Sequence, residues 1–199
     1  MQSGDAGLVL PLVAHYGTRR LWAKSGASHD RSRTSFSRQD GYTGSLDAVA
    51  DERQMLDWFY KMTAQDVQRA QSLRPMGESP LFATVRRAVE HCFEGVMGCK
   101  RASVTYNLDV DDLDIEYLDV RDEMQRIHMS LLSDGYRTTL SMFADMAYRM
   151  AILNPALGEH ALEAPGVVLI DEVDLHLHPL WQARILGDCA PRSPTSSSS

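Results

Sequence analysis

The sequence predicts an α/β fold, and three patterns support this class. Four apolar residues at 167–170, three of them β-branched, predict a buried strand that is central in a parallel sheet. Apolar residues at three- and four-residue steps predict helices over 50–73 and 80–97. Apolar and polar residues alternate over 102–106 and 113–117, which predicts two further strands. At 199 residues the chain is long enough for one domain with a substantial core.

Composition and charge exclude several classes of protein. The formal net charge of −7 argues against general attraction to nucleic acid. The three cysteines, Cys92, Cys99 and Cys189, have no C-x-x-C spacing, which predicts reduced thiols rather than disulfides or a zinc site. The sequence has no run of about 18 apolar residues and begins without the features of a signal peptide. We therefore expect a cytoplasmic protein with no membrane span.

The first predicted element is a buried strand at 8–14, in which Pro11 disturbs the hydrogen-bond ladder or marks an edge. The stretch 19–40 carries six basic and two acidic residues, which predicts a solvated loop. The alternative is a contact for phosphate or nucleic acid, although few aromatic residues are present to stack on bases. The residues that would make this contact are Arg19, Arg20, Arg31, Arg33 and Arg38.

Two amphipathic helices come next. The apolar stripe of the first helix ends where residues 74–77, Arg-Pro-Met-Gly, break its pattern. The second helix begins at Ser79 and Pro80, a cap followed by proline at the first helical position. Gly98 suits the end of this helix. Both stripes predict packing against a core or against another helix.

A hairpin follows the helices. The acidic turn 109–112 joins the two alternating segments. It lacks the glycine and the ligand spacing of a calcium loop, so we expect a solvated turn rather than a metal site. A third short strand is expected within 126–131.

Two adjacent carboxylates, Asp171 and Glu172, end the apolar strand at 167–170. Charges at the tip of a buried strand are costly unless they are used there. In a P-loop nucleotide hydrolase this is the Walker B arrangement, in which the Asp helps to hold Mg²⁺ and the Glu polarises the attacking water. The alternative is a buried strand that leaves the core through a polar turn.

A second motif, Leu-Ser-Asp-Gly-Tyr-Arg, occupies residues 132–137 and precedes a helix expected over 136–153. Ser133 supplies a hydroxyl, and Gly135 lets the backbone approach an anion closely. The helix N-terminus directs unpaired N–H groups and a positive dipole end toward such an anion. The alternative is an ordinary Ser-capped helix. The predicted buried face of the helix is formed by Leu140, Phe143, Ala147, Met150 and Ala151.

Together the two motifs resemble the ATPase head of the ABC superfamily. Within it they are similar to the RecF/SMC/OLD-type ATPases, often catalogued as AAA-family ATP-binding proteins. Residues 15–22 and the segment 174–182, Asp-Leu-His-Leu-His-Pro-Leu-Trp-Gln, also resemble that family. His176 and His178 could instead be metal ligands, but no third ligand of suitable spacing is visible.

The resemblance implies a site that uses ATP and Mg²⁺ in a head-to-tail homodimer. Asp171 would hold Mg²⁺ through water, and Glu172 would be the general base. The residues that would contact the γ-phosphate of ATP bound to the opposite subunit are Ser133, Gly135, Arg137 and His178.

The resemblance also implies a partial P-loop NTPase domain over 1–187. Its expected parts are a core strand and loop, an inserted helical subdomain, a group of strands, and the signature-to-D-loop region, at 8–22, 50–98, 101–131 and 132–187. The phosphate loop, Gly-x-x-x-x-Gly-Lys-(Ser/Thr), is absent from the sequence. We expect residues 188–199 to be a disordered tail or the product of a frameshift.

Without its phosphate loop the chain alone is expected to bind ATP poorly. Two other functions stay open from the sequence. One is a non-catalytic docking or regulatory module for a complete ATPase. The other is a DNA-associated module that uses the basic stretch 19–40, which a salt-dependent retention on DNA would reveal.

Overall fold

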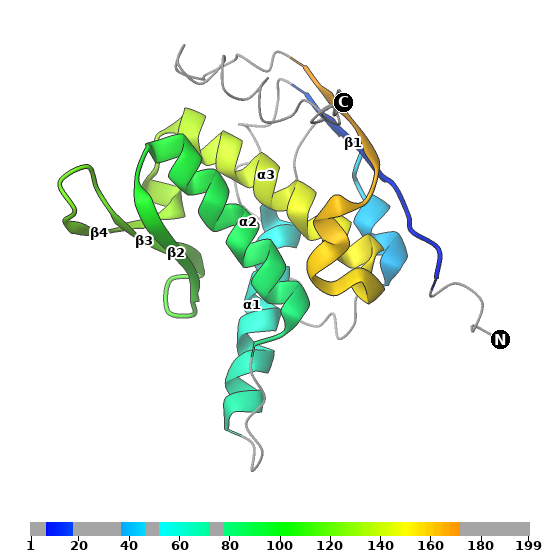
Figure 1. Ribbon diagram of the computed structural model, residues 1–199, viewed down its shortest axis with the longest axis horizontal. Helices are drawn as coiled ribbons and strands as arrows, with labels where there is room; N and C mark the ends of the chain where they lie inside the picture. Colours follow the sequence, from blue (N-terminus) through cyan, green and yellow to red (C-terminus); the bar gives the residue numbers. More distant parts are fainter. Residues whose placement is uncertain (1–6, 18–36, 47–51, 72–77, 172–199) are drawn as a thin grey trace, which may run out of the picture.

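The computed structural model describes residues 7–17, 37–46, 52–71 and 78–171 (Figure 1). This part of the chain has a mixed α/β architecture with two separate sheets. One sheet is antiparallel and the other is a parallel pair, and the long helices lie between them (Figure 1). The α/β class predicted from the sequence is confirmed at this level.

The larger core is formed by the helices and the antiparallel sheet. Strands β2, β3 and β4 follow one another as an antiparallel meander, with bounds Lys100–Asn107, Asp112–Leu118 and Met124–His128. Helices α1 and α2, Glu52–Ala70 and Pro80–Met97, contribute Trp58, Phe59, Phe82 and Phe93 to this core. Leu113 and Ile115 of β3 are fully buried and complete it from the sheet.

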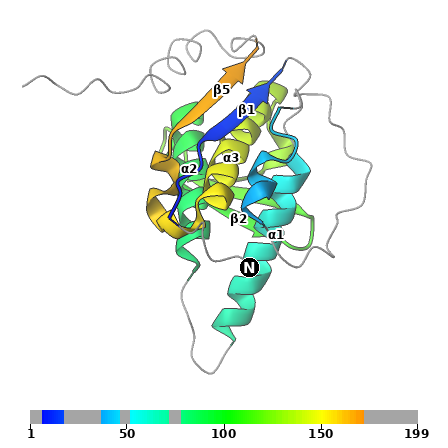
Figure 2. The same ribbon diagram turned by 90° about the vertical axis from the view of Figure 1, so that its right-hand side faces the viewer.

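A smaller core lies beneath the parallel pair. Strands β1 and β5, Leu12–Tyr16 and Gly166–Ile170, run in the same direction (Figure 2). Helix α3, Asp134–Leu153, covers one face of this pair and also contacts α1 and α2. The helix therefore joins the two cores.

Helix α2 has the boundaries that the sequence predicts. Pro80 is its first residue, and Gly98 adopts the left-handed conformation at its end, with φ of 64°. Ser79 is the N-cap, but its side chain makes no cap hydrogen bond. Helix α1 also confirms the helix predicted over 50–73.

Three predicted elements differ from the structure at their ends. The first strand begins at Leu12, after Pro11 rather than through it, and Leu8 and Val9 are exposed. The third strand, β4, begins two residues earlier than expected and ends where the 3-10 helix η3, Met129–Leu131, begins. Helix α3 also begins two residues earlier, directly after Ser133.

The strand at 167–170 was predicted to be fully buried and central, and this is wrong for the described part of the chain. Strand β5 pairs only with β1 there, and Val167 and Leu169 are 61% and 59% exposed. Val13 of β1, opposite Val167 in the register, is also exposed. Helix α3 covers the inner face of the pair. The outer face, with Val13, Val167 and Leu169, has no cover among the described residues.

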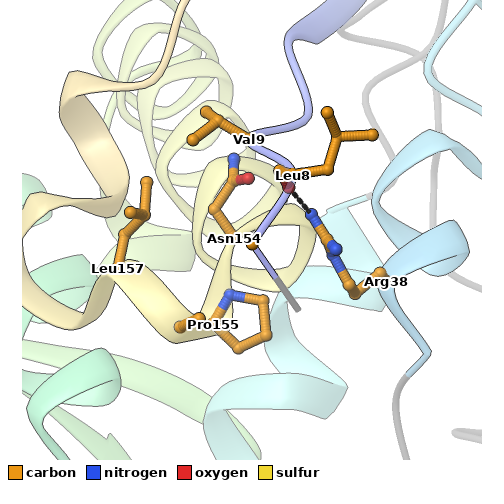
Figure 3. A pocket seen from close by; sticks show the side chains of 8 residues that line it. Leu8, Val9, Arg38, Asn154, Pro155 and Leu157 are labelled. Carbon is orange, nitrogen blue, oxygen red and sulfur yellow. Dashed lines mark hydrogen bonds between the residues drawn. The ribbon is translucent and has the colours of Figure 1, made fainter. Parts of the chain in front are cut away.

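A small pocket of about 150 Å³ lies where the segment before β1 meets the end of α3 (Figure 3). The Asn154 side chain accepts a hydrogen bond from the Leu10 N–H at 2.8 Å and donates one to the Leu10 carbonyl at 2.9 Å. Arg38, the first residue of the 3-10 helix η2, Arg38–Tyr42, donates to the carbonyls of Leu8 and Leu153 at 2.5 and 2.6 Å. These polar groups hold the N-terminal segment against α3.

None of the helices in the described ranges is both long and apolar enough to cross a lipid bilayer. Cys92 and Cys99 are partly buried, and Cys189 lies outside the described residues. The 3-10 helix η4, Pro155–Glu163, connects α3 to β5. Residues 19–36 of the basic stretch, the segment after Asp171 and the C-terminal tail are not among the described residues.

Candidate functional site

Asp171 lies at the carboxyl end of β5, where the sequence predicts a carboxylate for Mg²⁺. Its backbone N–H donates to the Tyr16 carbonyl at 2.8 Å, which extends the pairing of β1 and β5 by one step. Its side chain is 59% exposed, and the Oδ2 atom lies 3.1 Å from Nε2 of His15. Glu172 and His178, the predicted general base and a predicted γ-phosphate contact, lie outside the described residues.

The predicted signature lies at the start of α3. Ser133 is the N-cap of the helix and is exposed, and its side chain makes no cap hydrogen bond. The Arg137 N–H donates to the Ser133 carbonyl at 2.9 Å, so helical bonding begins at the signature itself. Gly135 and the Arg137 side chain are partly buried. The start of α3 and the tips of β1 and β5 lie at the same end of the molecule (Figures 1 and 2).

A buried polar cluster connects β1 to α3 directly behind Asp171. The Tyr16 hydroxyl donates to Asp145 at 2.8 Å, and Arg149 donates to the same carboxylate oxygen at 2.7 Å. Arg149 also donates to the carbonyls of Gly41 and Thr43 at 3.0 and 2.8 Å. The side chains of Asp145 and Arg149 are each only 1% exposed. This cluster joins the strand, the helix and η2 below the candidate site.

The charges of this cluster are matched. Burial raises the pKa of Tyr16 above its ordinary value, and the neighbouring Asp145 carboxylate adds to this effect, so Tyr16 stays a neutral donor. Burial works to lower the pKa of Arg149, but the Asp145 carboxylate outweighs it and the pKa is raised. Arg149 is therefore charged at any physiological pH.

Gly41 explains how closely η2 approaches α3 at this point. A Cβ atom added at Gly41 would lie 2.6 Å from Cγ of Leu153 and 3.2 Å from the Arg149 carbonyl oxygen. Only glycine leaves room for the carbonyl of residue 41 to reach the Arg149 guanidinium.

A second polar cluster lies on the outer face of the antiparallel sheet, on different elements from Asp171. Asp114 of β3 is almost fully buried and receives hydrogen bonds from Asn107 and Arg126, while Nδ1 of His128 lies against its other oxygen. Burial raises the pKa of Asp114, but these partners outweigh it and hold the pKa below its usual range. The cluster fastens the three strands to one another.

Of the five arginines predicted to contact phosphate or nucleic acid, the structure describes Arg38. Arg38 directs its guanidinium to backbone carbonyls of its own chain rather than outward (Figure 3). Arg19, Arg20, Arg31 and Arg33 lie outside the described residues. Use of this stretch for nucleic acid stays a prediction.

The described ligand groups near Asp171 are compatible with Mg²⁺. Among the described residues no group of three or more His, Cys, Asp or Glu side chains is placed to hold a metal ion. Mg²⁺ is usually held by one or two carboxylates, with waters and substrate phosphates as the other ligands. An exposed carboxylate at a strand end fits that pattern.

Sequence reasoning missed three residues of this region. The sequence indicates His15 only as part of a family-like segment. Its contact with Asp171 is not predicted because the two residues are 156 positions apart. Asp145 and Arg149 carried a usable signal, since opposite charges four residues apart in an apolar helix indicate an ion pair. The predicted stripe placed neither of them in the core, yet no residue of α3 from Thr138 to Leu153 is exposed.

Parts of the chain are similar to proteins with known names, although no protein-family model matches it. A "Retron Vc95 probable ATPase" from Vibrio cholerae serotype O1 biovar El Tor is 53% identical over 55 residues, 28% of this chain and 10% of that protein. A "Retron Ec83 probable ATPase" from Escherichia coli is 44% identical over 71 residues, 35% of this chain and 13% of that protein.

A "Septu protein PtuA" from Bacillus mycoides (strain KBAB4) is 40% identical over 55 residues, which are 28% of this chain and 7% of that protein. The chain thus matches only about a tenth of the length of these curated relatives. About a third of the chain is therefore related to proteins named as probable ATPases.

Proposed function

We propose that this chain is the signature and Walker B part of an ABC-type ATPase head, which binds and hydrolyses ATP when a phosphate loop completes it. The observation that carries the proposal is the Asp171 carboxylate at the carboxyl end of β5, in a parallel pair covered by the helix that begins at the signature. Ligands of α/β sheets bind outside the carboxyl ends of the strands. Partial similarity to two proteins named as probable ATPases supports the same function.

Each predicted residue has a distinct role in this proposal. Asp171 would hold Mg²⁺ through a water molecule, and Glu172 would accept a proton from the water that attacks the γ-phosphate. Bound Mg²⁺ would neutralise the charge that develops on the phosphate oxygens. The exposure of Asp171 supports this role, because a carboxylate that holds an ion through water needs solvent at its oxygens.

We propose further that the signature acts on ATP held by a second copy of the chain. Ser133, Gly135, Arg137 and His178 would contact the γ-phosphate in trans. The exposed Ser133, whose side chain makes no cap hydrogen bond at the start of α3, is compatible with that role. ATP would close the homodimer and its hydrolysis would reopen it.

One face of the parallel pair has no cover among the described residues, which supports a head in which further elements cover it. Val13, Val167 and Leu169 present an apolar surface there, whereas parallel sheets are usually covered on both faces. A pair of strands with one apolar face in water is marginally stable by itself. The elements that supply the phosphate loop would cover this face.

The variant Glu172→Gln tests the proposed function. In a head completed by a phosphate loop it should bind ATP without hydrolysing it, because its amide cannot accept the proton of the attacking water. We expect the variant to form a dimer when Mg²⁺ and ATP are added. Light scattering after size-exclusion chromatography should then give twice the monomer mass. The isolated 199-residue chain, which lacks the loop, should show no turnover.

The matched control is Glu159→Gln, which changes the same charge on the exposed helix η4 and should hydrolyse ATP normally. If Glu172→Gln has the same mass and the same hydrolysis rate as the unchanged protein, the ATPase proposal is wrong. The chain would then be a docking or regulatory module. Measurable ATP turnover by the isolated chain would also contradict the proposed need for a phosphate loop.

A further inference from the structure

His15 contacts Asp171, the described carboxylate that would hold Mg²⁺ in the proposed function. Its Nε2 atom lies 3.1 Å from Oδ2 of Asp171, and the two residues come from different strands of the parallel pair. The two residues are 156 positions apart in the sequence, so the fold brings them together. A role for His15 at this site rests on the proposed function, in which the Asp171 carboxylate holds Mg²⁺.

The strand register fixes the relative positions of the two side chains. His15 is paired with Leu169, and Asp171 follows two residues after Leu169, so all three side chains belong to the outer face of the pair. Both backbones are held at this point. The His15 N–H donates to the Ser45 carbonyl at 2.7 Å, and the Asp171 N–H donates to the Tyr16 carbonyl at 2.8 Å.

The two side chains differ in exposure. Asp171 is 59% exposed, while His15 is 27% exposed. A carboxylate in water rotates readily about its terminal bond, and an N–H donor at one oxygen restricts that rotation. Hydrogen-bond partners of this kind orient the ligands of metal sites, and their removal typically costs about 10- to 100-fold in metal affinity.

We propose that His15 is a positioning residue that orients the Asp171 carboxylate for a divalent cation. The imidazole carries its proton on Nε2 and donates it to Oδ2. It does not coordinate the ion, because Mg²⁺ prefers oxygen ligands.

Two NMR measurements on the isotope-labelled 199-residue chain test the proposal without any activity assay. The first is a long-range ¹H–¹⁵N spectrum of the histidine rings, in which Nε2 of His15 should carry the proton. The second is titration with Mn²⁺ alone, as a paramagnetic probe for Mg²⁺. Mn²⁺ should broaden the backbone signals of Ile170 and Asp171, and Asp171→Asn should remove this broadening.

Substitutions of His15 separate positioning from simple packing. His15→Leu should weaken the Mn²⁺ affinity about 10-fold, the lower end of the range for such partners. His15→Gln places an amide donor near the position of Nε2 and should restore most of the affinity. His160→Leu, on the exposed helix η4, is the matched control and should leave the affinity unchanged. Unchanged amide signals elsewhere establish that each variant is folded.

The outcomes distinguish this inference from the proposed function. If Mn²⁺ broadens Ile170 and Asp171 equally in the His15→Leu variant, the positioning role is wrong while the role of Asp171 stands. An unprotonated Nε2 on His15 also overturns the positioning role. If Mn²⁺ does not broaden these signals in the unchanged chain, Asp171 does not hold a divalent cation without ATP and the positioning role is wrong, while the proposed function is still decided by the Glu172→Gln variant of the completed head.

Discussion

Replacing Arg149 with methionine is expected to lower the free energy of unfolding by about 3–5 kcal/mol, since it leaves the buried Asp145 carboxylate without its charged partner. The substitution also removes the donor for the carbonyls of Gly41 and Thr43. Those two bonds connect η2 to α3. Urea denaturation followed by circular dichroism measures the change in the free energy of unfolding. The expected loss is a large part of the total stability of a typical domain.

The control for this prediction is Arg69→Met on α1. Arg69 pairs with Asp66 at 3.0 Å but is 38% exposed, so its removal should cost less than about 1 kcal/mol. A second variant changes both members of the buried pair, Asp145→Leu with Arg149→Met, and should be more stable than Arg149→Met alone. If the Arg149 and Arg69 variants unfold at the same urea concentration, the buried cluster does not hold the strand, the helix and η2 together.

The second large effect is expected from Trp58→Ala in α1. Trp58 is fully buried, and its ring centroid lies 5.5 Å from those of Phe59, Phe82 and Tyr148. Truncation removes these aromatic contacts and leaves a cavity where three helices meet. Such changes cost about 3–5 kcal/mol. Urea denaturation again gives the loss, and Trp58→Phe, which keeps an aromatic ring, should lose less.

Val67→Ala on the same helix is the matched control. Val67 is half-exposed, so its truncation is expected to change stability by less than about 0.5 kcal/mol. If Trp58→Ala is no more destabilising than Val67→Ala, Trp58 is not at the centre of the larger core. The packing of α1 against α2 and α3 would then need another explanation.

Local patterns were sufficient to predict the class and order of the described elements. Proline and glycine fixed the ends of α2, and alternation predicted β2 and β3, because these signals act within a few residues. Burial was harder to predict. The apolar run of β5 indicates a strand covered on both faces, but a pattern cannot tell which segment covers it, and its outer face is exposed in the described structure.

The candidate site was predictable only where a motif carries its own signal. Asp171 and Ser133 stand out because carboxylates end an apolar strand and a serine precedes a helix. His15 and Tyr16 acquire their roles through partners more than a hundred positions away. The first contact depends on the pairing of β1 with β5 and the second on the packing of α3 against β1, and no local pattern specifies either.

We propose that this chain is part of an ATPase head that a phosphate loop completes. Determining the genomic DNA sequence several hundred bases on each side of the reading frame tests this claim most directly. The resemblance implies a Thr-His-Ser-Pro segment with a switch histidine after Walker B. We therefore expect Gly-x-x-x-x-Gly-Lys-Ser upstream and this segment downstream, in a frame shifted near residues 187–188. Clean start and stop signals around residues 1–199, with neither motif nearby, would contradict the claim and favour a docking module.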